Sequence, residues 1–275
     1  MEELNDQELN DESTEIEEEE EELNHTDKLV GVITEPANTF SEMSKFPAKT
    51  VDWIVPLLIF ILFVSLSTII MQTNPIIKRT MIDKQMEAIE KNMDEAVKTG
   101  RMTQEQVDSQ MESIRERIVG GGMIMLIPQV VGIFIVTFII FFAVSGYFFA
   151  LSKFGLKGEG TYKDGMVAYG LPLYIAAIQV IINLILAMLM DKMVTDTSIA
   201  TLMDSDKTQL AGFLLSKVDP LSIWFYAVVG IGFAKMFKSD NIGKYVGMVI
   251  ASWLIFSLIF FYIGKAVPML NFAGA

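Results

Sequence analysis

Apolar residues in this chain gather into long runs that carry almost no charge, and charged segments separate these runs. A helix needs about 20 apolar residues to cross the hydrocarbon core of a bilayer. Five runs come near this length: Trp53–Met71, Gly120–Leu151, Met166–Met190, Leu221–Ala234 and Tyr245–Gly264. The pattern therefore predicts an all-α protein, a polytopic membrane helix bundle with about five transmembrane helices.

Two of the runs depart from the ideal length. The second is long for one crossing, so we expect it to tilt, to protrude or to kink near Pro128. The fourth is short, and it reaches spanning length only if the side chain of Lys235 extends toward the membrane surface. Small residues indicate close helix packing in both runs: Gly132 and Gly146 in the second, and Gly230, Gly232 and Ala234 in the fourth.

The segment between the first two runs, residues 75–119, has the pattern of two short helices outside the membrane. Thr99, Gly100 and Arg101 break the pattern in the middle, and Thr103 and Gln106 have the spacing of a capping box for the second helix. Apolar residues recur at steps of three and four, which is typical of a narrow, coiled-coil-like seam: Ile82, Met86, Ile89, Met93 and Val97, then Val107, Met111, Ile114 and Ile118. We predict a helical hairpin.

The chain ahead of the first run divides into two parts. Residues 1–27 are rich in glutamate and supply most of the net charge of −13, and so low an apolar content predicts a disordered acidic tail. Residues 28–50 are predicted to form a cytoplasmic juxtamembrane segment with a short amphipathic stretch, interrupted by Pro36 and followed by a short helix capped at Asn38 or Thr39. Residues 51–275 then form the membrane domain.

Lysines in the short loops predict the orientation of the bundle, since cytoplasmic loops are enriched in positive charge. With five spans, the loops near Lys153 and Lys238 and the N-terminal flank lie on one side. We therefore place the N-terminus in the cytoplasm and the C-terminus outside. Three residues are predicted to act as anchors at the membrane interface: Trp53, Trp224 and Lys235.

The chain offers little that could carry catalysis. It has no cysteine, and its one histidine, His25, falls in the acidic tail, so neither a thiolate nor a histidine base or metal site is expected. Phosphate-binding loops and hydrolase motifs are also absent from the sequence. We predict no catalytic, metal or cofactor site, and the acidic balance argues against a nucleic-acid partner.

Within the runs the notable polar residues are amides, and no ionisable side chain lies away from the ends. Gln129 is in the second run, while Gln179 and Asn183 are four residues apart in the third. Such amides commonly form interhelical hydrogen bonds worth about 0.6–2 kcal/mol each. A pocket for a polar ligand or a lipid head group is the alternative. The lack of ionisable groups argues against ion-coupled transport.

Three segments of the chain have a distinctive order and spacing: GVITEPANTFSEMSKFP followed by DWIVPLL, then AYGLPLYIAAIQVIINLIL, and finally DPLSIWFYAVVGIGFAKMFKSDNIGKYVGMVIASWLI. They resemble, in that order, the entry segment, a middle span and the final pair of spans of Yip-domain membrane proteins, the Rab/Ypt-interacting protein family. The resemblance covers most of Leu29–Ile263, fits the bacterial branch, and implies five spans in the inner membrane with a cytoplasmic N-terminus and a short outer C-terminus.

The resemblance does not extend to GTPase binding. Eukaryotic members of the family bind Rab-type GTPases, but this chain lacks their acidic-aromatic D-L-Y-G-P-type motif in its cytoplasmic tail.

Our leading hypothesis is a non-enzymatic membrane protein that organises membranes or scaffolds protein partners. The partners would be the lipid bilayer, proteins bound through the tail or the hairpin, and further copies of this chain. The alternative is a passive transporter or lipid-handling protein with a polar site between the second and third spans.

Overall fold

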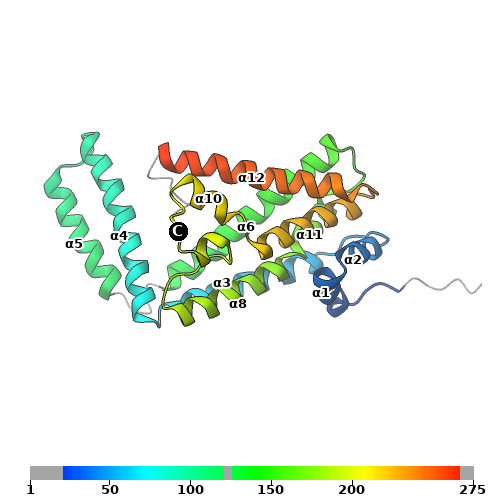
Figure 1. The fold of residues 1–275 in the computed structure, drawn as a ribbon, viewed down its shortest axis with the longest axis horizontal. Helices are drawn as coiled ribbons and strands as arrows, with labels where there is room; N and C mark the ends of the chain where they lie inside the picture. The colour runs from blue at the N-terminus through cyan, green and yellow to red at the C-terminus, as the bar shows by residue number, and fades with distance from the viewer. Residues whose placement is uncertain (1–20, 121–125, 267–275) are drawn as a thin grey trace, which may run out of the picture.

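The computed structural model describes residues 21–120 and 126–266, and all regular structure in these residues is helical (Figure 1). The all-α prediction is thereby confirmed. The helices are α1 (His25–Thr34), α2 (Pro36–Met43), α3 (Val51–Met71), α4 (Pro75–Lys98), α5 (Gln104–Gly120), α6 (Leu126–Ala150), the π-helical turn η2 (Leu151–Gly155), α7 (Tyr162–Gly170), α8 (Leu173–Met190), α9 (Ile199–Leu202), α10 (Leu210–Ser216), α11 (Pro220–Met236) and α12 (Ile242–Ala266).

Helices α3, α6, α8, α11 and α12 run side by side along the long axis of the molecule (Figure 1). Four segments are long and apolar enough to cross a membrane: Val51–Met71, Leu126–Gly155, Tyr162–Met190 and Ile242–Ala266. The short fourth run qualifies only together with α10, as a pair bent by 60°. The described residues therefore contain four candidate spans, or five if the bent pair counts as one.

Two prolines have different effects on the spans. Pro128 is the third residue of α6 as described, and the α-helix continues through it without interruption. Pro172 separates α7 from α8 and breaks the third span near its start. The second span reaches 30 residues because the π-helical turn continues α6 to Gly155.

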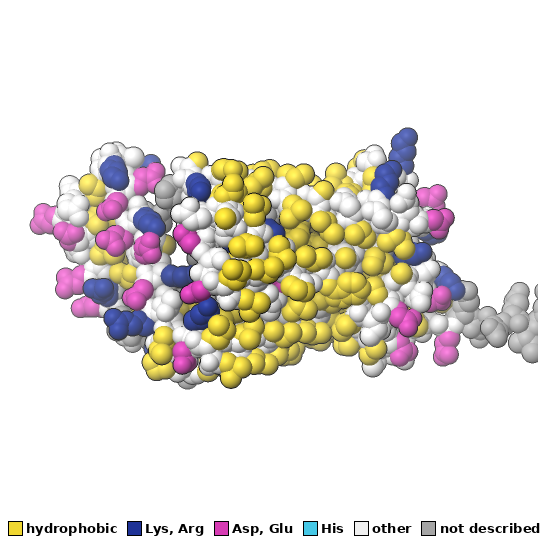
Figure 2. Space-filling view, viewed as in Figure 1, with side chains coloured by type: hydrophobic (Ala, Val, Ile, Leu, Met, Phe, Trp, Pro, Cys, Tyr) yellow, Lys and Arg dark blue, Asp and Glu magenta, His cyan; other side chains and the backbone are white. Residues whose placement is uncertain are grey.

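The middle of the molecule carries a belt of exposed apolar side chains, and charged residues gather at both ends (Figure 2). Leu62 of α3, Ile139 of α6, Leu189 of α8 and Ile255 of α12 are each at least half exposed. Soluble monomers rarely expose so large an apolar surface. This belt, with the candidate spans beneath it, identifies an integral membrane protein.

Helix α11 lies at the centre of the bundle and contacts α12, α7, α8 and α2. Its glycines allow the close approach that the sequence predicted. A Cβ atom on Gly230 would lie 2.5 Å from the Cα of Val246, and one on Gly232 would lie 2.9 Å from the carbonyl oxygen of Ala168. Gly132 of α6 has open space beside it, so the prediction of close packing is wrong there.

The predicted hairpin is present as α4 and α5, which pack against each other at one end of the molecule (Figure 1). Gly100 makes the turn with a φ of 70°. The capping box forms as well: the amide of Thr103 donates to Gln106 Oε1 at 2.9 Å, and the amide of Gln106 donates to Thr103 Oγ1 at 3.3 Å. Met86 and Val107 are buried in the seam, whereas most charged residues of the hairpin are exposed.

The N-terminal segments differ from the sequence prediction in two ways. Helix α1 begins at His25, so residues 25–27 are helical instead of disordered; residues 1–20 lie outside the described residues. Helix α2 begins at Pro36, not at a cap on Asn38 or Thr39. Both helices turn their apolar faces onto the bundle, where Val32 and Phe40 are fully buried.

Candidate functional site

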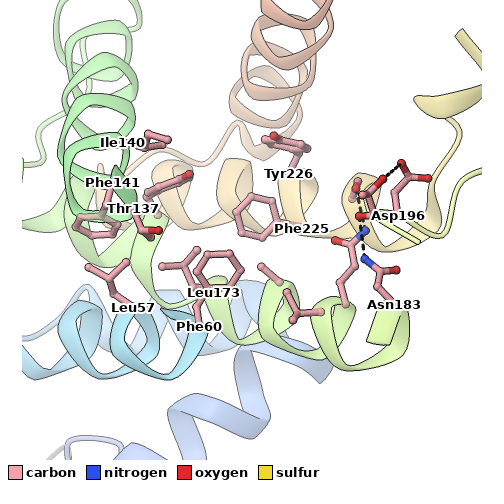
Figure 3. Close-up of a pocket in the computed structure, with 16 residues that line it drawn as sticks. Leu57, Phe60, Thr137, Ile140, Phe141, Leu173, Asn183, Asp196, Phe225 and Tyr226 are labelled. Carbon is pink, nitrogen blue, oxygen red and sulfur yellow. Dashed lines mark hydrogen bonds between the residues drawn. The ribbon is translucent and has the colours of Figure 1, made fainter. Parts of the chain in front are cut away.

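A cavity of about 420 Å³ lies between α3, α6, α8 and α11 (Figure 3). Its walls are mostly apolar, with Leu57 from α3, Phe141 from α6, Leu173 from α8 and Phe225 from α11. Figure 3 shows Asn183 and Asp196 together at one end, away from Leu57 and Phe141. The cavity is therefore amphiphilic: its amide and carboxylate groups lie at one end, and the rest is mostly apolar with a few hydroxyls, such as those of Thr137 and Tyr226.

The polar end is built from the last half of α8, the loop that follows it, and the first turn of α11. Gln179 and Asn183 are one helical turn apart on α8, so both side chains face the same way. Thr195 and Asp196 come from the loop, and Ser222 comes from α11.

Directly behind this end lies Asp219, which caps the N-terminus of α11 and is 1% exposed. Its Oδ2 accepts hydrogen bonds from Gln179 Nε2 at 2.7 Å and from Ser222 Oγ at 2.7 Å. Its Oδ1 accepts from Thr197 Oγ1 at 2.5 Å and from the amide of Leu221 at 3.2 Å. Every partner that the described part of the chain gives this carboxylate is electrically neutral.

Asn183 is only partly satisfied. Its Nδ2 donates to the carbonyl oxygen of Thr195 at 3.0 Å, but its Oδ1 is buried and accepts no hydrogen bond. A buried polar atom left without a partner costs about 1–3 kcal/mol. Because this oxygen has no accessible surface, the missing hydrogen bond is a cost within the fold and not an open position for a ligand.

The second carboxylate of the polar end, Asp196, is neutralised. Lys207 Nζ donates to its Oδ2 at 2.6 Å, and the hydroxyls of Ser198 and Thr201 donate to its Oδ1, each at 2.5 Å. Burial raises the pKa of Asp196, but these hydrogen bonds outweigh burial and bring the pKa to about 2. The carboxylate is therefore ionised and paired at neutral pH.

Of the three amides singled out from the sequence, the structure brings two together. Gln129 lies outside the cavity, on α6, where its Oε1 accepts a hydrogen bond from Gln72 Nε2 of α3 at 3.1 Å. This pair has the interhelical structural role that polar residues often take in membrane bundles. Gln179 and Asn183 alone belong to the candidate site.

The three predicted anchors take different places. Trp53 is 9% exposed and its ring stacks on Phe141 with centroids 5.2 Å apart, so it packs into the bundle instead of facing the interface as predicted. Trp224 is 37% exposed near the start of α11. Lys235 is half-buried in the last turn of the same helix.

A second polar cluster fastens α1 to the opposite end of the bundle. Lys28 Nζ lies 3.0 Å from Asp52 Oδ1 of α3 and 2.9 Å from Glu22 Oε1, and Lys49 also pairs with Glu22. His25 Nε2 lies 2.6 Å from the hydroxyl of Tyr174 on α8. Burial lowers the pKa of Lys28, but the hydrogen bonds and charges of Glu22 and Asp52 outweigh it and raise the pKa overall.

The sequence pattern did not predict these buried ionisable groups, because they lie outside the apolar runs and polar residues there are usually exposed. Asp52 and Asp219 stand just outside the runs in sequence, yet they are 3% and 1% exposed in the fold. A signal for Asp219 was present, since an aspartate directly before a proline is typical of a helix N-terminus. Its contact with Gln179, 40 residues away, could not be read from spacing.

Among residues 21–120 and 126–266, no group of three or more histidine, cysteine, aspartate or glutamate side chains is placed to hold a metal ion. The arrangement supports binding by hydrogen bonds and apolar contact.

The family model of the Yip1 domain matches residues 30–264, which covers most of the chain from α1 to the end of α12. No curated protein sequence and no solved structure matches the chain.

Proposed function

This chain belongs to the Yip1 domain family of membrane proteins, and from that premise we propose that it acts without catalysis, organising the membrane or scaffolding protein partners at its surface. The observation that carries the proposal is the α4–α5 hairpin. It extends from one end of the bundle, beyond the apolar belt (Figures 1 and 2).

The surface of the hairpin suits a protein partner better than a lipid surface. Its apolar seam is closed between α4 and α5, so little remains to insert into a bilayer. Acidic and basic side chains alternate on its outer faces, as in the exposed pair Glu87 and Lys91. Mixed charge favours selective pairing with a complementary protein surface, whereas an anionic membrane selects a purely basic one.

The test is site-specific photo-crosslinking in native membranes, with the crosslinker at the exposed position Gln110 of α5. We expect an adduct of one defined mass, and we expect charge reversal at Glu112 and Glu116 to reduce its yield at least tenfold because the complementary charges are lost. A crosslinker at Ile139, in the apolar belt, is the control and should give no such adduct. A further copy of this chain would be recognised by the adduct mass.

Absence of any adduct, together with unchanged membrane organisation after removal of residues 75–119, would contradict the scaffolding proposal. The charge-reversal variants at Glu112 and Glu116 keep the buried seam residues Met86 and Val107, so the packing of α4 on α5 should stay intact. A lower adduct yield in these variants would then report lost binding and not an unfolded hairpin.

We also propose that α10 and α11 together form a fifth crossing, with the N-terminus in the cytoplasm and the C-terminus outside, in a bacterial inner membrane. Support comes from the two short connections at the α1–α2 end of the molecule, where Lys157 and Lys238 lie in the loops and Lys153 and Lys244 lie in the helical turns beside them. Short basic loops lie on the cytoplasmic side of most membrane proteins. The hairpin would then lie outside.

The amphiphilic cavity favours a second candidate function, the handling of a lipid or similar molecule. A passive channel for polar solutes needs polar groups along its whole length, but the amides and the carboxylate of this cavity gather at one end, and only a few hydroxyls such as that of Thr137 line the rest. A molecule with a polar head and an apolar chain matches that distribution.

A further inference from the structure

We propose that the cavity between α3, α6, α8 and α11 binds an amphiphile whose uncharged or cationic head donates hydrogen bonds through a hydroxyl or amine group. The inference rests on the lipid-handling function and names the ligand chemistry that the site selects. It is independent of the hairpin and of any protein partner.

The hydrogen bonds around Asp219 decide which groups are left for a ligand. Gln179 uses both amide hydrogens on Asp219 Oδ2 and Ser222 Oγ, at 2.7 and 3.2 Å. Ser222 and Thr197 give their hydroxyl hydrogens to the same carboxylate. The donor hydrogens of Gln179, Ser222 and Thr197 are therefore already used in these hydrogen bonds and are not free for a ligand.

The acceptor that remains for a ligand at the polar end is Gln179 Oε1, which accepts no hydrogen bond from the described residues. The orientation of the Gln179 amide is fixed, because its Nε2 donates to the Asp219 carboxylate and the reversed amide would place two acceptors together. Asn183 Oδ1 is also without a donor, but it has no accessible surface and turns away from the cavity (Figure 3). A free acceptor takes a ligand that supplies a donor.

Hydrogen-bond chemistry, not net charge, makes the selection. Lys207 pairs with Asp196, and the charge of Lys217 also interacts with that carboxylate. Asp219 accepts hydrogen bonds only from neutral groups among the described residues. A carboxylate or phosphate head brings acceptors alone and has no hydrogen to donate to Gln179 Oε1, whereas a hydroxyl or ammonium head has one.

The rest of the cavity suits an apolar chain. Its volume of about 420 Å³ falls in the range of small-molecule sites. Phe225 is the apolar wall nearest the polar end, Phe60 and Leu173 lie together in the middle, and Leu57 and Phe141 form the far part (Figure 3). Burying an apolar chain there would contribute a favourable free energy of about 25 cal/mol for each Å² of apolar surface removed from water.

The experiment measures binding of three amphiphiles with the same oleyl chain to the full-length protein, delipidated in mild detergent: 1-monooleoylglycerol, oleylamine and oleate. We expect the alcohol and the amine to bind at one-to-one stoichiometry and at least tenfold more tightly than oleate. Oleate binding as tightly as the other two would overturn the inference.

Variants separate the polar and apolar parts of the site. Replacing Gln179 and Asn183 together with leucine should remove the preference for donor heads. Ala176→Phe fills the apolar part without touching the Asp219 network and should weaken all three amphiphiles at least tenfold, while its unfolding temperature stays at or above that of the parent protein. Gln129→Leu removes a matched amide outside the cavity and should leave binding unchanged; equal loss in this control would contradict the site.

Native mass spectrometry of the protein taken directly from membranes distinguishes the source of the ligand. A co-purified lipid with a hydroxyl or amine head, lost in Ala176→Phe, identifies a membrane lipid. Binding of added amphiphile without a co-purified lipid identifies a soluble one. Failure of every amphiphile to bind overturns this inference, whereas the crosslink from the hairpin would still report on scaffolding.

Discussion

Gly230→Leu is expected to prevent assembly of the membrane bundle, so that little folded protein can be purified. A Cβ atom at this position would lie 2.5 Å from the Cα and 2.9 Å from the amide nitrogen of Val246 on α12. Those are backbone atoms, so the clash can be relieved only by separating two whole helices. Since α11 also contacts α7, α8 and α2, we expect destabilisation at the upper end of overpacking effects, about 3 kcal/mol or more.

Gly247→Leu is the matched control, because this glycine of α12 has nothing within 4 Å of an added Cβ atom. We expect the control to be purified in normal yield with an unfolding temperature, measured by differential scanning fluorimetry in detergent, close to that of the parent protein. If Gly230→Leu also behaves as the parent protein does, the proposed packing of α11 on α12 is wrong.

Lys28→Met should release α1 from the bundle. Lys28 and Asp52 are 4% and 3% exposed, and the substitution leaves the Asp52 carboxylate buried without its cation. Removing one partner of a buried ion pair destabilises proteins by about 3–5 kcal/mol. Hydrogen exchange in α1 and α2 should therefore become much faster, while exchange in α3 changes less.

Two further variants make the prediction specific. Replacing both partners, Lys28→Met with Asp52→Leu, should restore most of the protection, because an apolar pair leaves no buried charge. Lys91→Met breaks an exposed pair with Glu87 and should change protection in α1 and α2 little. Equal effects of Lys28→Met and Lys91→Met would show that the buried pair has no special importance.

The sequence predicted the parts of the fold that depend on local patterns. The hairpin seam, the turn at Gly100 and the capping box of Thr103 and Gln106 all follow from spacing within a few residues, and all are present. The apolar runs likewise locate α3, α6, α8 and α12. Short-range periodicity is sufficient for such elements because each helix forms its hydrogen bonds within itself.

What the sequence did not predict depends on contacts between distant residues. Trp53 is of the residue type and in the position typical of an interfacial anchor. Its ring instead stacks on Phe141, 88 positions later in the chain, and is buried. The sequence places Asp219 at the end of a polar loop, where an exposed side chain is expected. In the fold it is buried, because α8 and α11 pack together and bring Gln179 against it. The amides Gln129 and Gln179 look alike in the sequence, and only the fold separates a structural pair from a cavity wall.

The two ends of the molecule and its middle carry different features. One end carries α1 and α2, fastened by a buried ion pair, and the other carries the charged hairpin (Figure 1). Between them, the belt faces lipid and the cavity opens within the bundle. A membrane organiser with this arrangement can present a protein-binding surface on one side of the bilayer while the bundle holds an amphiphile.

Whether α11 crosses the membrane decides if the loop between α11 and α12 lies on the side opposite the hairpin, and the chain suits a direct test because it has no cysteine. Single cysteines at the exposed positions Thr26, Ser109 and Asp240 would be treated with a membrane-impermeant maleimide in intact cells. Our account predicts labelling of Ser109→Cys alone, with Thr26→Cys and Asp240→Cys labelled only after permeabilisation. Labelling of Asp240→Cys together with Ser109→Cys in intact cells would place both on the same side and contradict the five-span arrangement.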